Sequence, residues 1–157
     1  MLKILTVCLG NICRSPIAEE LLRKSCNDLD LDVFVDSAGT ANYHVGAPPD
    51  VRMIQTAKQF DCDISTLRAR QFQRQDFERF DYIFTMDESN KSNVLKLATS
   101  KEQESKVFDF QQFAEIKSPD FVPDPYYGTA RDFTETFRIV DESAQRIAAK
   151  LKKIHQL

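Results

Sequence analysis

The chain has 157 residues, of which 42% are hydrophobic and 29% are charged, and its formal net charge is −3. This length and apolar content predict one domain over residues 1–157, with a core that buries about two-thirds of the unfolded surface. A slightly acidic chain is unlike nucleic-acid-binding proteins, which usually present a strongly basic face. No apolar segment reaches the length of a membrane span, about 18 residues, and the N-terminus lacks the pattern of a signal peptide. We therefore expect no nucleic-acid or membrane partner and a cytoplasmic location.

The first predicted strand, residues 4–8, leads through a short loop into the first predicted helix, residues 15–25. Residues 4–7 are apolar and the strand ends on a cysteine. Ser15 and Pro16 are typical of a helix start, with serine as N-cap and proline at the first helical position, and two acids follow. The sequence therefore predicts a strand–loop–helix unit at the N-terminus.

This loop has the properties of an anion site. Backbone N–H groups of a curled loop and the positive end of the next helix dipole together attract an anion. Cys8 opens the loop and Arg14 closes it. A thiol in such surroundings should lose its proton easily and act as a nucleophile, while a guanidinium matches two phosphate oxygens as lysine cannot. Gly10 and Asn11 tolerate the backbone angles that a curled loop needs. The unit indicates phosphoryl transfer through a phosphocysteine; the alternative is a plain turn with a buried cysteine.

The rest of the chain alternates between predicted strands and helices. Strands are expected over residues 31–35, 81–85 and 106–110, helices over residues 50–60, 87–98 and 133–154, and a charged turn over residues 101–106. Asp87 is predicted to be the N-cap of its helix rather than an acid catalyst. Alternation of this kind predicts an α/β fold, in which parallel strands are joined by right-handed crossovers.

Asp124 lies in a loop between the last predicted strand and the last helix. Pro123 and Pro125 flank it and restrict the directions in which the carboxyl can point. Loops that follow parallel strands share one edge of the sheet, so this loop and the Cys8 loop can meet. Asp124 is therefore a candidate general acid; the alternative is a turn opener, because Asp-Pro often begins a turn.

The four cysteines and two histidines do not predict a metal site. Cys8 and Cys13 are five positions apart, which is not the spacing of a zinc knuckle, and few histidines remain as further ligands. The cysteines are expected to be free thiols, with Cys26 and Cys62 as small core residues. We expect no metal and no other cofactor.

Several of these motifs resemble those of the low-molecular-weight protein tyrosine phosphatase family. They are residues 8–16 (CLGNICRSP), 36–40 (DSAGT), 69–71 (ARQ), 80–83 (FDYI), 86–90 (MDESN) and 124–128 (DPYYG). The resemblance covers almost the whole chain. It implies a three-layer sandwich with helices on both faces of a four-stranded parallel sheet of order 2-1-3-4. It also implies an enzyme that hydrolyses phosphotyrosine and small aryl phosphates, with Cys8 as nucleophile, Arg14 as phosphate clamp and Asp124 as general acid and base.

The resemblance assigns further residues to the same site. The implied substrate-binding residues are Leu9, Gly10, Asn11, Ile12, Cys13 and Ser15, with Tyr43 and Tyr127 as walls, and the implied loop supports are Asn11, Ser15 and Ser37. At the position of a histidine that helps to support the loop in the family, this chain has Leu67, so that support is expected to differ. A reversible disulfide between Cys8 and Cys13 is implied as protection of the nucleophile. Phosphorylation of Tyr126 or Tyr127 by a tyrosine kinase is implied as well; a simple surface turn is the alternative.

Three other functions fit the same loop. Protein-arginine phosphatases of the family tend to have threonine where this chain has Ile12, which favours phosphotyrosine. Arsenate reductases of this fold use two later cysteines, whereas this chain has no cysteine after Cys62. The third alternative is a non-catalytic sensor of oxyanions or thiol oxidation. For the phosphatase, inorganic phosphate and other oxyanions are expected to compete with substrate.

Overall fold

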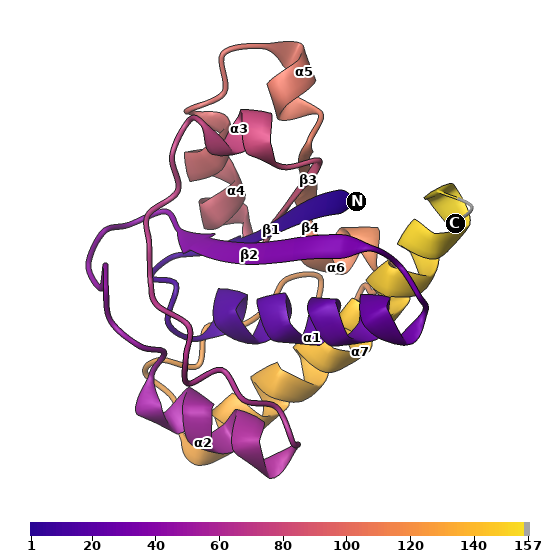
Figure 1. Ribbon diagram of the computed structural model, residues 1–157. Coiled ribbons are helices and arrows are strands. Elements are labelled where there is room, and N and C mark those ends of the chain that lie inside the picture. Colours follow the sequence, from indigo (N-terminus) through magenta and orange to yellow (C-terminus); the bar gives the residue numbers. More distant parts are fainter. Residues whose placement is uncertain (156–157) are drawn as a thin grey trace.

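The computed structural model describes residues 1–155, which form a four-stranded parallel sheet between two layers of helices (Figure 1). The strands are β1 (Leu2–Cys8), β2 (Val33–Gly39), β3 (Tyr82–Thr85) and β4 (Val107–Asp109), in the order β2-β1-β3-β4. The helices are α1 (Arg14–Asp28), α2 (Val51–Gln59), α3 (Asp76–Arg79), α4 (Glu88–Leu95), α5 (Lys101–Glu104), α6 (Phe110–Phe113) and α7 (Ala130–His155). The predicted fold class and strand order are confirmed.

The sheet separates two hydrophobic cores. Successive side chains of β1 point to opposite faces, so Ile4 belongs to the core under α1 and α7 while Leu5 belongs to the core under α3 and α4. Both side chains are fully buried, as expected for a central strand of a parallel sheet. In Figure 1, α1, α2 and α7 lie below the sheet, and α3 and α4 lie above it. Because β1 and β3 pair in parallel, their C-terminal ends lie at the same edge of the sheet.

The start of α1 differs from the prediction. The helix begins at Arg14, its N-cap is Cys13, and no side chain caps it. Ser15 lies inside the helix, where its hydroxyl faces the Cys8 sulfur instead of a free backbone N–H. The prediction of Ser15 as N-cap is therefore wrong, because contacts inside the loop outweigh local capping preference.

Smaller differences concern element boundaries and short helices. Strand β2 spans Val33–Gly39, so it begins and ends later than the predicted strand over residues 31–35. The predicted charged turn forms the short helix α5, which Ser100 caps by accepting a hydrogen bond from the backbone N–H of Gln103. Helices α3 and α6 were not predicted, since each spans only one turn. Within residues 1–155, no helix combines the length and the apolar character required to cross a bilayer.

Candidate active site

Cys8 ends β1 and lies at the floor of the following loop. Its side chain is 2% exposed. The backbone N–H of Asn11 donates to the Cys8 sulfur at 3.3 Å, and the Ser15 hydroxyl lies 3.1 Å from the same atom. The loop and the first turn of α1 thus surround the sulfur with polar groups that can hydrogen-bond to it.

The curl of the loop depends on two special positions. Asn11 has a φ of +59°, as its residue type suggested, whereas Gly10 is not in the left-handed region. Glycine is required instead at Gly39, where an added Cβ would lie 2.7 Å from the Leu9 carbonyl oxygen. The end of β2 therefore packs directly against the loop, and only a residue without a side chain allows the two backbones to come this close.

A chain of polar side chains supports the loop from below. The Asn11 amide donates to the hydroxyls of Ser15 at 2.8 Å and Ser37 at 3.0 Å. The Ser37 hydroxyl donates in turn to Glu19 at 2.7 Å. Because each partner is buried, the hydrogen bonds fix the side chains in one arrangement. The three predicted loop supports therefore do lie together, and Glu19 is a fourth member that the sequence did not predict.

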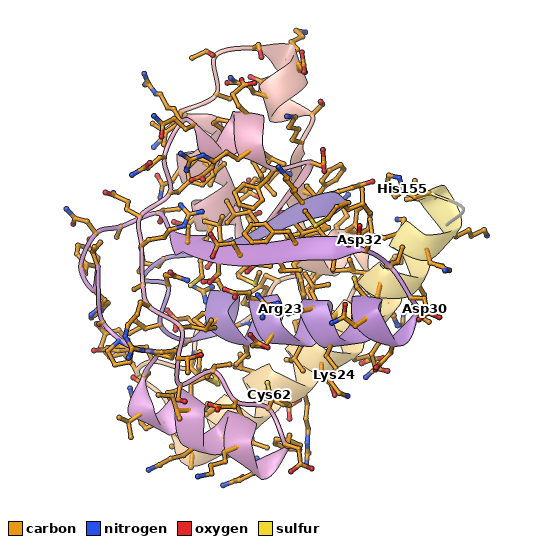
Figure 2. All side chains as sticks on the ribbon, in the orientation of Figure 1. Arg23, Lys24, Asp30, Asp32, Cys62 and His155 are labelled. Carbon is orange, nitrogen blue, oxygen red and sulfur yellow. The ribbon has the colours of Figure 1, made fainter. Side chains whose placement is uncertain are left out.

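Glu19 is a buried carboxyl at the base of this chain. Burial raises its pKa, while hydrogen bonds from Arg23 and Ser37 oppose that rise. Arg23, which is labelled in Figure 2, donates to Glu19 at 2.7 Å and to the Val35 carbonyl on β2 at 2.7 Å. The network thus ties α1 to β2 directly beneath the loop.

Arg14 projects from the first residue of α1 and is 3% exposed. It donates to Asp87 at 2.6 Å and to the Val122 carbonyl at 3.1 Å, and its other terminal nitrogen lies 3.6 Å from an Asp124 carboxylate oxygen. Burial by itself would lower the pKa of Arg14, but the charge of Cys8 and the neighbouring carboxylates outweigh burial and raise it. Arg14 is therefore a fixed, permanently charged group facing Cys8.

Asp87 has two roles in this arrangement. Its side chain accepts a hydrogen bond from the backbone N–H of Asn90 at 2.8 Å and caps α4, as predicted. Its other oxygen holds Arg14. This second contact joins residues 73 positions apart, and nothing in the local sequence indicates it.

Asp124 lies in the loop between α6 and α7 and is 39% exposed. One carboxylate oxygen accepts from the Tyr126 backbone N–H at 3.1 Å, and the other faces Arg14. The backbone N–H of Val122 donates to the Met86 carbonyl at 2.7 Å, which attaches this loop to the end of β3. Asp124 therefore reaches the same edge of the sheet as the Cys8 loop.

The three groups line one cavity of about 300 Å³, which we call the Cys8 cavity. It is lined by Cys8, Leu9, Gly10, Ile12, Cys13, Arg14, Tyr43, His44, Asp124, Tyr126 and Tyr127. Asn11 and Ser15, which were predicted to bind substrate, lie behind this wall as loop supports. His44 and Tyr126 were missed, although each adjoins a tyrosine that was predicted as a wall. A larger cleft of about 870 Å³, beside Asp87 and Phe121, has no cysteine in its lining.

Comparison with known proteins identifies the family. A sequence model described as low molecular weight phosphotyrosine protein phosphatase matches residues 3–157. The chain belongs to this family.

Individual relatives agree with this assignment over nearly their full length. A low molecular weight phosphotyrosine protein phosphatase from Dictyostelium discoideum is 37% identical, with 98% of this chain and 95% of that protein covered. A protein tyrosine phosphatase structure from Entamoeba histolytica is 34% identical, has a TM-score of 0.93 and covers both chains completely. A Drosophila arginine phosphatase structure is 32% identical, with a TM-score of 0.88 and coverage of 96% and 98%.

Leu67 is the position at which this low molecular weight phosphatase was expected to support its loop differently. The Leu67 side chain is partly buried and packs against the hydrophobic core. The Asn11 side-chain oxygen accepts a hydrogen bond at 3.0 Å from the Arg70 backbone N–H. A backbone group thus satisfies the Asn11 oxygen, and no ionisable side chain is needed there.

All four cysteines of this family member lie within the described residues, and all four are free thiols. Cys13 is 4% exposed, and burial raises its pKa, with the nearby carboxyl of Asp50 adding to the rise. Burial raises the pKa of Cys26 and of Cys62 to about 11. Cys26 lies in the core as predicted, while Cys62 is partly buried against it. No cluster of three or more potential metal ligands occurs within residues 1–155.

Proposed function

We propose that this chain is a protein tyrosine phosphatase that hydrolyses phosphotyrosine and small aryl phosphates through a phosphocysteine intermediate. The single observation that carries the proposal is the presence of Cys8, Arg14 and Asp124 in the lining of one cavity. A nucleophile, a bidentate phosphate ligand and a carboxyl for proton transfer are the groups that this reaction needs. Membership of the phosphatase family supports the same conclusion.

The proposed first step transfers the phosphoryl group to sulfur. The Cys8 thiolate attacks phosphorus in line with the departing phenol oxygen, so that a sulfur–phosphorus bond forms as the phosphorus–oxygen bond breaks. Backbone N–H groups of the loop and the Arg14 guanidinium donate to the three equatorial oxygens. Asp124, protonated at the start, gives its proton to the phenolate, and the neutral phenol leaves.

The proposed second step returns the enzyme to its starting state. Asp124, now ionised, removes a proton from water, the water oxygen attacks phosphorus, and the sulfur–phosphorus bond breaks. Ser15, whose hydroxyl lies 3.1 Å from the Cys8 sulfur, donates a hydrogen bond to the thiolate as it leaves. The products are inorganic phosphate and an enzyme with Asp124 protonated. Because Arg14 and the loop amides offset the phosphate charge, we propose that hydrolysis is independent of metal ions.

Aryl-phosphate hydrolysis at mildly acidic pH, with a chelator present and vanadate as competitor, tests the function. A phosphatase of this kind should turn over in chelator and be inhibited by vanadate, because a trigonal-bipyramidal oxyanion resembles the transition state. A protein that binds vanadate without hydrolysing any aryl phosphate would be an oxyanion sensor. Reduction of arsenate with a thiol donor would indicate the reductase instead.

The apolar walls of the Cys8 cavity support phosphotyrosine over phosphoarginine. Ile12, Tyr43 and Tyr127 surround the approach to Cys8 and suit a flat phenyl ring. The likeness to an arginine phosphatase keeps phosphoarginine as the second candidate. Values of kcat/KM for matched phosphotyrosine and phosphoarginine peptides decide between them. A higher kcat/KM for the phosphoarginine peptide, found in both wild type and Ile12→Thr, would contradict our assignment of the wall.

Replacement of Asp124 by asparagine should slow hydrolysis by about 10²- to 10³-fold, because asparagine cannot protonate the leaving group. The loss should be greater for phenyl phosphate than for p-nitrophenyl phosphate, whose leaving group is already stable as an anion. Vanadate should still bind, since Arg14 and the loop are unchanged. Asp120→Asn, in the same loop but outside the Cys8 cavity, is the matched control. Equal losses with both substrates would contradict the role of Asp124 as proton donor.

We propose that Cys8 and Cys13 form a reversible disulfide under oxidation. Both cysteines line the Cys8 cavity, and a disulfide would block further oxidation of the nucleophile. Peroxide treatment should yield one linked peptide containing both cysteines, with activity restored by a thiol reductant. Peptide mapping checks this. Irreversible sulfinic acid at Cys8 without any linked peptide would contradict the pairing.

Three further properties complete the proposal. A tyrosine kinase would find Tyr127 more accessible than Tyr126, since Tyr127 is 95% exposed and the Tyr126 ring packs against Arg52. Mass spectrometry after kinase treatment would locate the phosphate. Inorganic phosphate and other oxyanions should compete with substrate for the same loop. Free thiols are typical of reducing compartments, which supports a cytoplasmic location, and cell fractionation tests it.

A further inference from the structure

His44 lies in the wall of the Cys8 cavity, on the loop that also carries Tyr43. Its imidazole ring lies near two tyrosine rings, with centroids 6.5 Å from Tyr43 and 6.4 Å from Tyr126. It also covers the nucleophile loop at Gly10, where an added Cβ would lie 3.1 Å from the imidazole Cδ2 and 3.8 Å from Nε2. His44 therefore faces the loop that would hold a phosphate group.

The ring nitrogens of His44 are not engaged by other protein groups. Within residues 1–155 the imidazole has no hydrogen bond and no ion pair; the only bond of this residue is from the Ala47 N–H to its backbone carbonyl. The side chain is half-buried, so it retains access to the cavity. A histidine with a structural role usually has a fixed partner on at least one ring nitrogen, whereas within residues 1–155 this ring lies against the two tyrosine rings and the loop at Gly10.

Titratable and charged groups around His44 come from each element that lines the cavity or packs behind it. They are Cys8, Cys13 and Arg14 on the nucleophile loop and α1, Asp124 with Tyr126 and Tyr127 on the loop before α7, Tyr43 on its own loop, and Arg52 of α2 behind Tyr126. Among the residues that line the cavity, Arg14 is the permanent cation. A phosphate dianion next to a thiolate brings about three negative charges to that one guanidinium. A second positive charge in the wall would therefore strengthen binding.

We propose that His44, in its protonated form, is a second substrate-binding cation of the Cys8 cavity and makes anion binding tighter as the pH falls. Imidazole ordinarily takes up a proton between about pH 8 and pH 5, and it is the side chain that does so in this range. The proposal rests on the proposed phosphatase function, because that function identifies the anion as the phosphate of the substrate or an acidic residue beside it. His44 is thereby a residue that determines specificity for anionic groups of the substrate.

Sulfate is the probe for the phosphate position, because it keeps two negative charges from about pH 5.5 to pH 8. Its dissociation constant is measured by NMR titration, which needs no turnover. Replacing His44 by asparagine removes the charge and keeps a polar side chain of moderate size. We expect His44→Asn to bind sulfate about threefold to tenfold more weakly than wild type at pH 5.5, and equally well at pH 8. Comparison of the two proteins at the same pH isolates the contribution of the His44 side chain.

Two further variants make the test specific. His44→Lys keeps a positive charge at both pH values, so it should bind sulfate more tightly than wild type at pH 8. His155→Asn removes the other histidine of the chain, which hydrogen-bonds Tyr82 at 2.9 Å, far from the Cys8 cavity. This control should follow wild type at both pH values. A dependence on His155 equal to that on His44 would overturn the proposal.

Phosphotyrosine peptides with either glutamate or glutamine next to the phosphotyrosine distinguish the two sources of negative charge. The ratio of their kcat/KM values is independent of the chemical step, since both share it. If His44 contacts the flanking acid, the ratio should rise by about threefold between pH 8 and pH 5.5 in wild type and stay constant in His44→Asn. An effect on sulfate but not on this ratio assigns His44 to the phosphate position.

The proposal is wrong if His44→Asn and wild type have equal sulfate affinities at pH 5.5 and equal peptide ratios at both pH values. Such a result would leave the proposed function intact, provided that both proteins hydrolyse aryl phosphates. Conversely, a protein without hydrolytic activity that still shows the sulfate effect would retain His44 as an anion-binding residue and lose the proposed function.

Discussion

Replacing Cys8 by serine is expected to reduce kcat for aryl-phosphate hydrolysis by about 10⁴-fold or more. A serine hydroxyl is a much weaker acid and a weaker nucleophile than a thiol, so the nucleophile is lost while the shape of the loop is kept. Cys8 is 2% exposed and is surrounded by Asn11 and Ser15, groups that can hydrogen-bond a hydroxyl equally well. The fold should therefore persist. Initial rates with p-nitrophenyl phosphate, together with a thermal unfolding curve, measure both effects.

Cys62→Ser is the matched control for this prediction, because Cys62 is a partly buried thiol outside the Cys8 cavity. Its activity should stay within about twofold of wild type, as is usual for changes away from the reacting groups. If Cys8→Ser hydrolysed aryl phosphates at a near wild-type rate, another residue would have to be the nucleophile. Loss of activity in both variants, accompanied by unfolding, would show a structural effect instead; retained vanadate binding by Cys8→Ser excludes that explanation.

Replacing Arg14 by lysine is expected to reduce kcat/KM by about 10³-fold, although the charge is retained. The Arg14 guanidinium contacts Asp87, the Val122 carbonyl and Asp124 at once, and its planar fork can still present two N–H groups to phosphate. A lysine ammonium that pairs with Asp87 cannot also reach the equatorial oxygens. Steady-state kinetics and the dissociation constant of vanadate, which should rise strongly, check this prediction.

Arg146→Lys is the control for the change of arginine to lysine, since Arg146 is exposed on α7 and, within residues 1–155, pairs only with Glu142 on the same helix. It should behave as wild type, because an exposed pair of this kind contributes little. Arg14→Lys should remain folded, since Asp87 keeps a cationic neighbour. If Arg14→Lys bound vanadate as tightly as wild type, planar bidentate recognition would not be the role of Arg14. The loop amides alone would then hold the oxyanion.

Most of the architecture follows from local patterns in the amino-acid sequence. Apolar runs that end at Cys8 and Thr85, each followed by a helix, favour parallel strands, because parallel pairing needs a crossover connection and a helix usually supplies it. The same logic brings the loops that hold Cys8 and Asp124 to one edge of the sheet. The φ of Asn11 and the cap at Asp87 were predictable for a similar reason: both depend on residues within a few positions.

Contacts between distant segments could not be predicted from local patterns. Ser15 has the sequence context of an N-cap, yet its hydroxyl points to Cys8 because Asn11 and the buried loop compete for it. Asp87 holds Arg14 across 73 positions. The placement of His44 in the cavity wall is of the same kind, since the sequence shows only that it follows Tyr43.

The amino-acid sequence by itself thus determined the order of strands and helices, the nucleophile loop and the family. Local backbone preferences and hydrophobic periodicity suffice for the strands, helices and loop, because they act between neighbours in the chain, whereas the family followed from the resemblance of its motifs. The tertiary structure alone decided which side chains support the loop, what holds Arg14 and which groups complete the cavity wall. Those contacts join segments that are distant in the sequence, so they form only when the packed core brings these segments together.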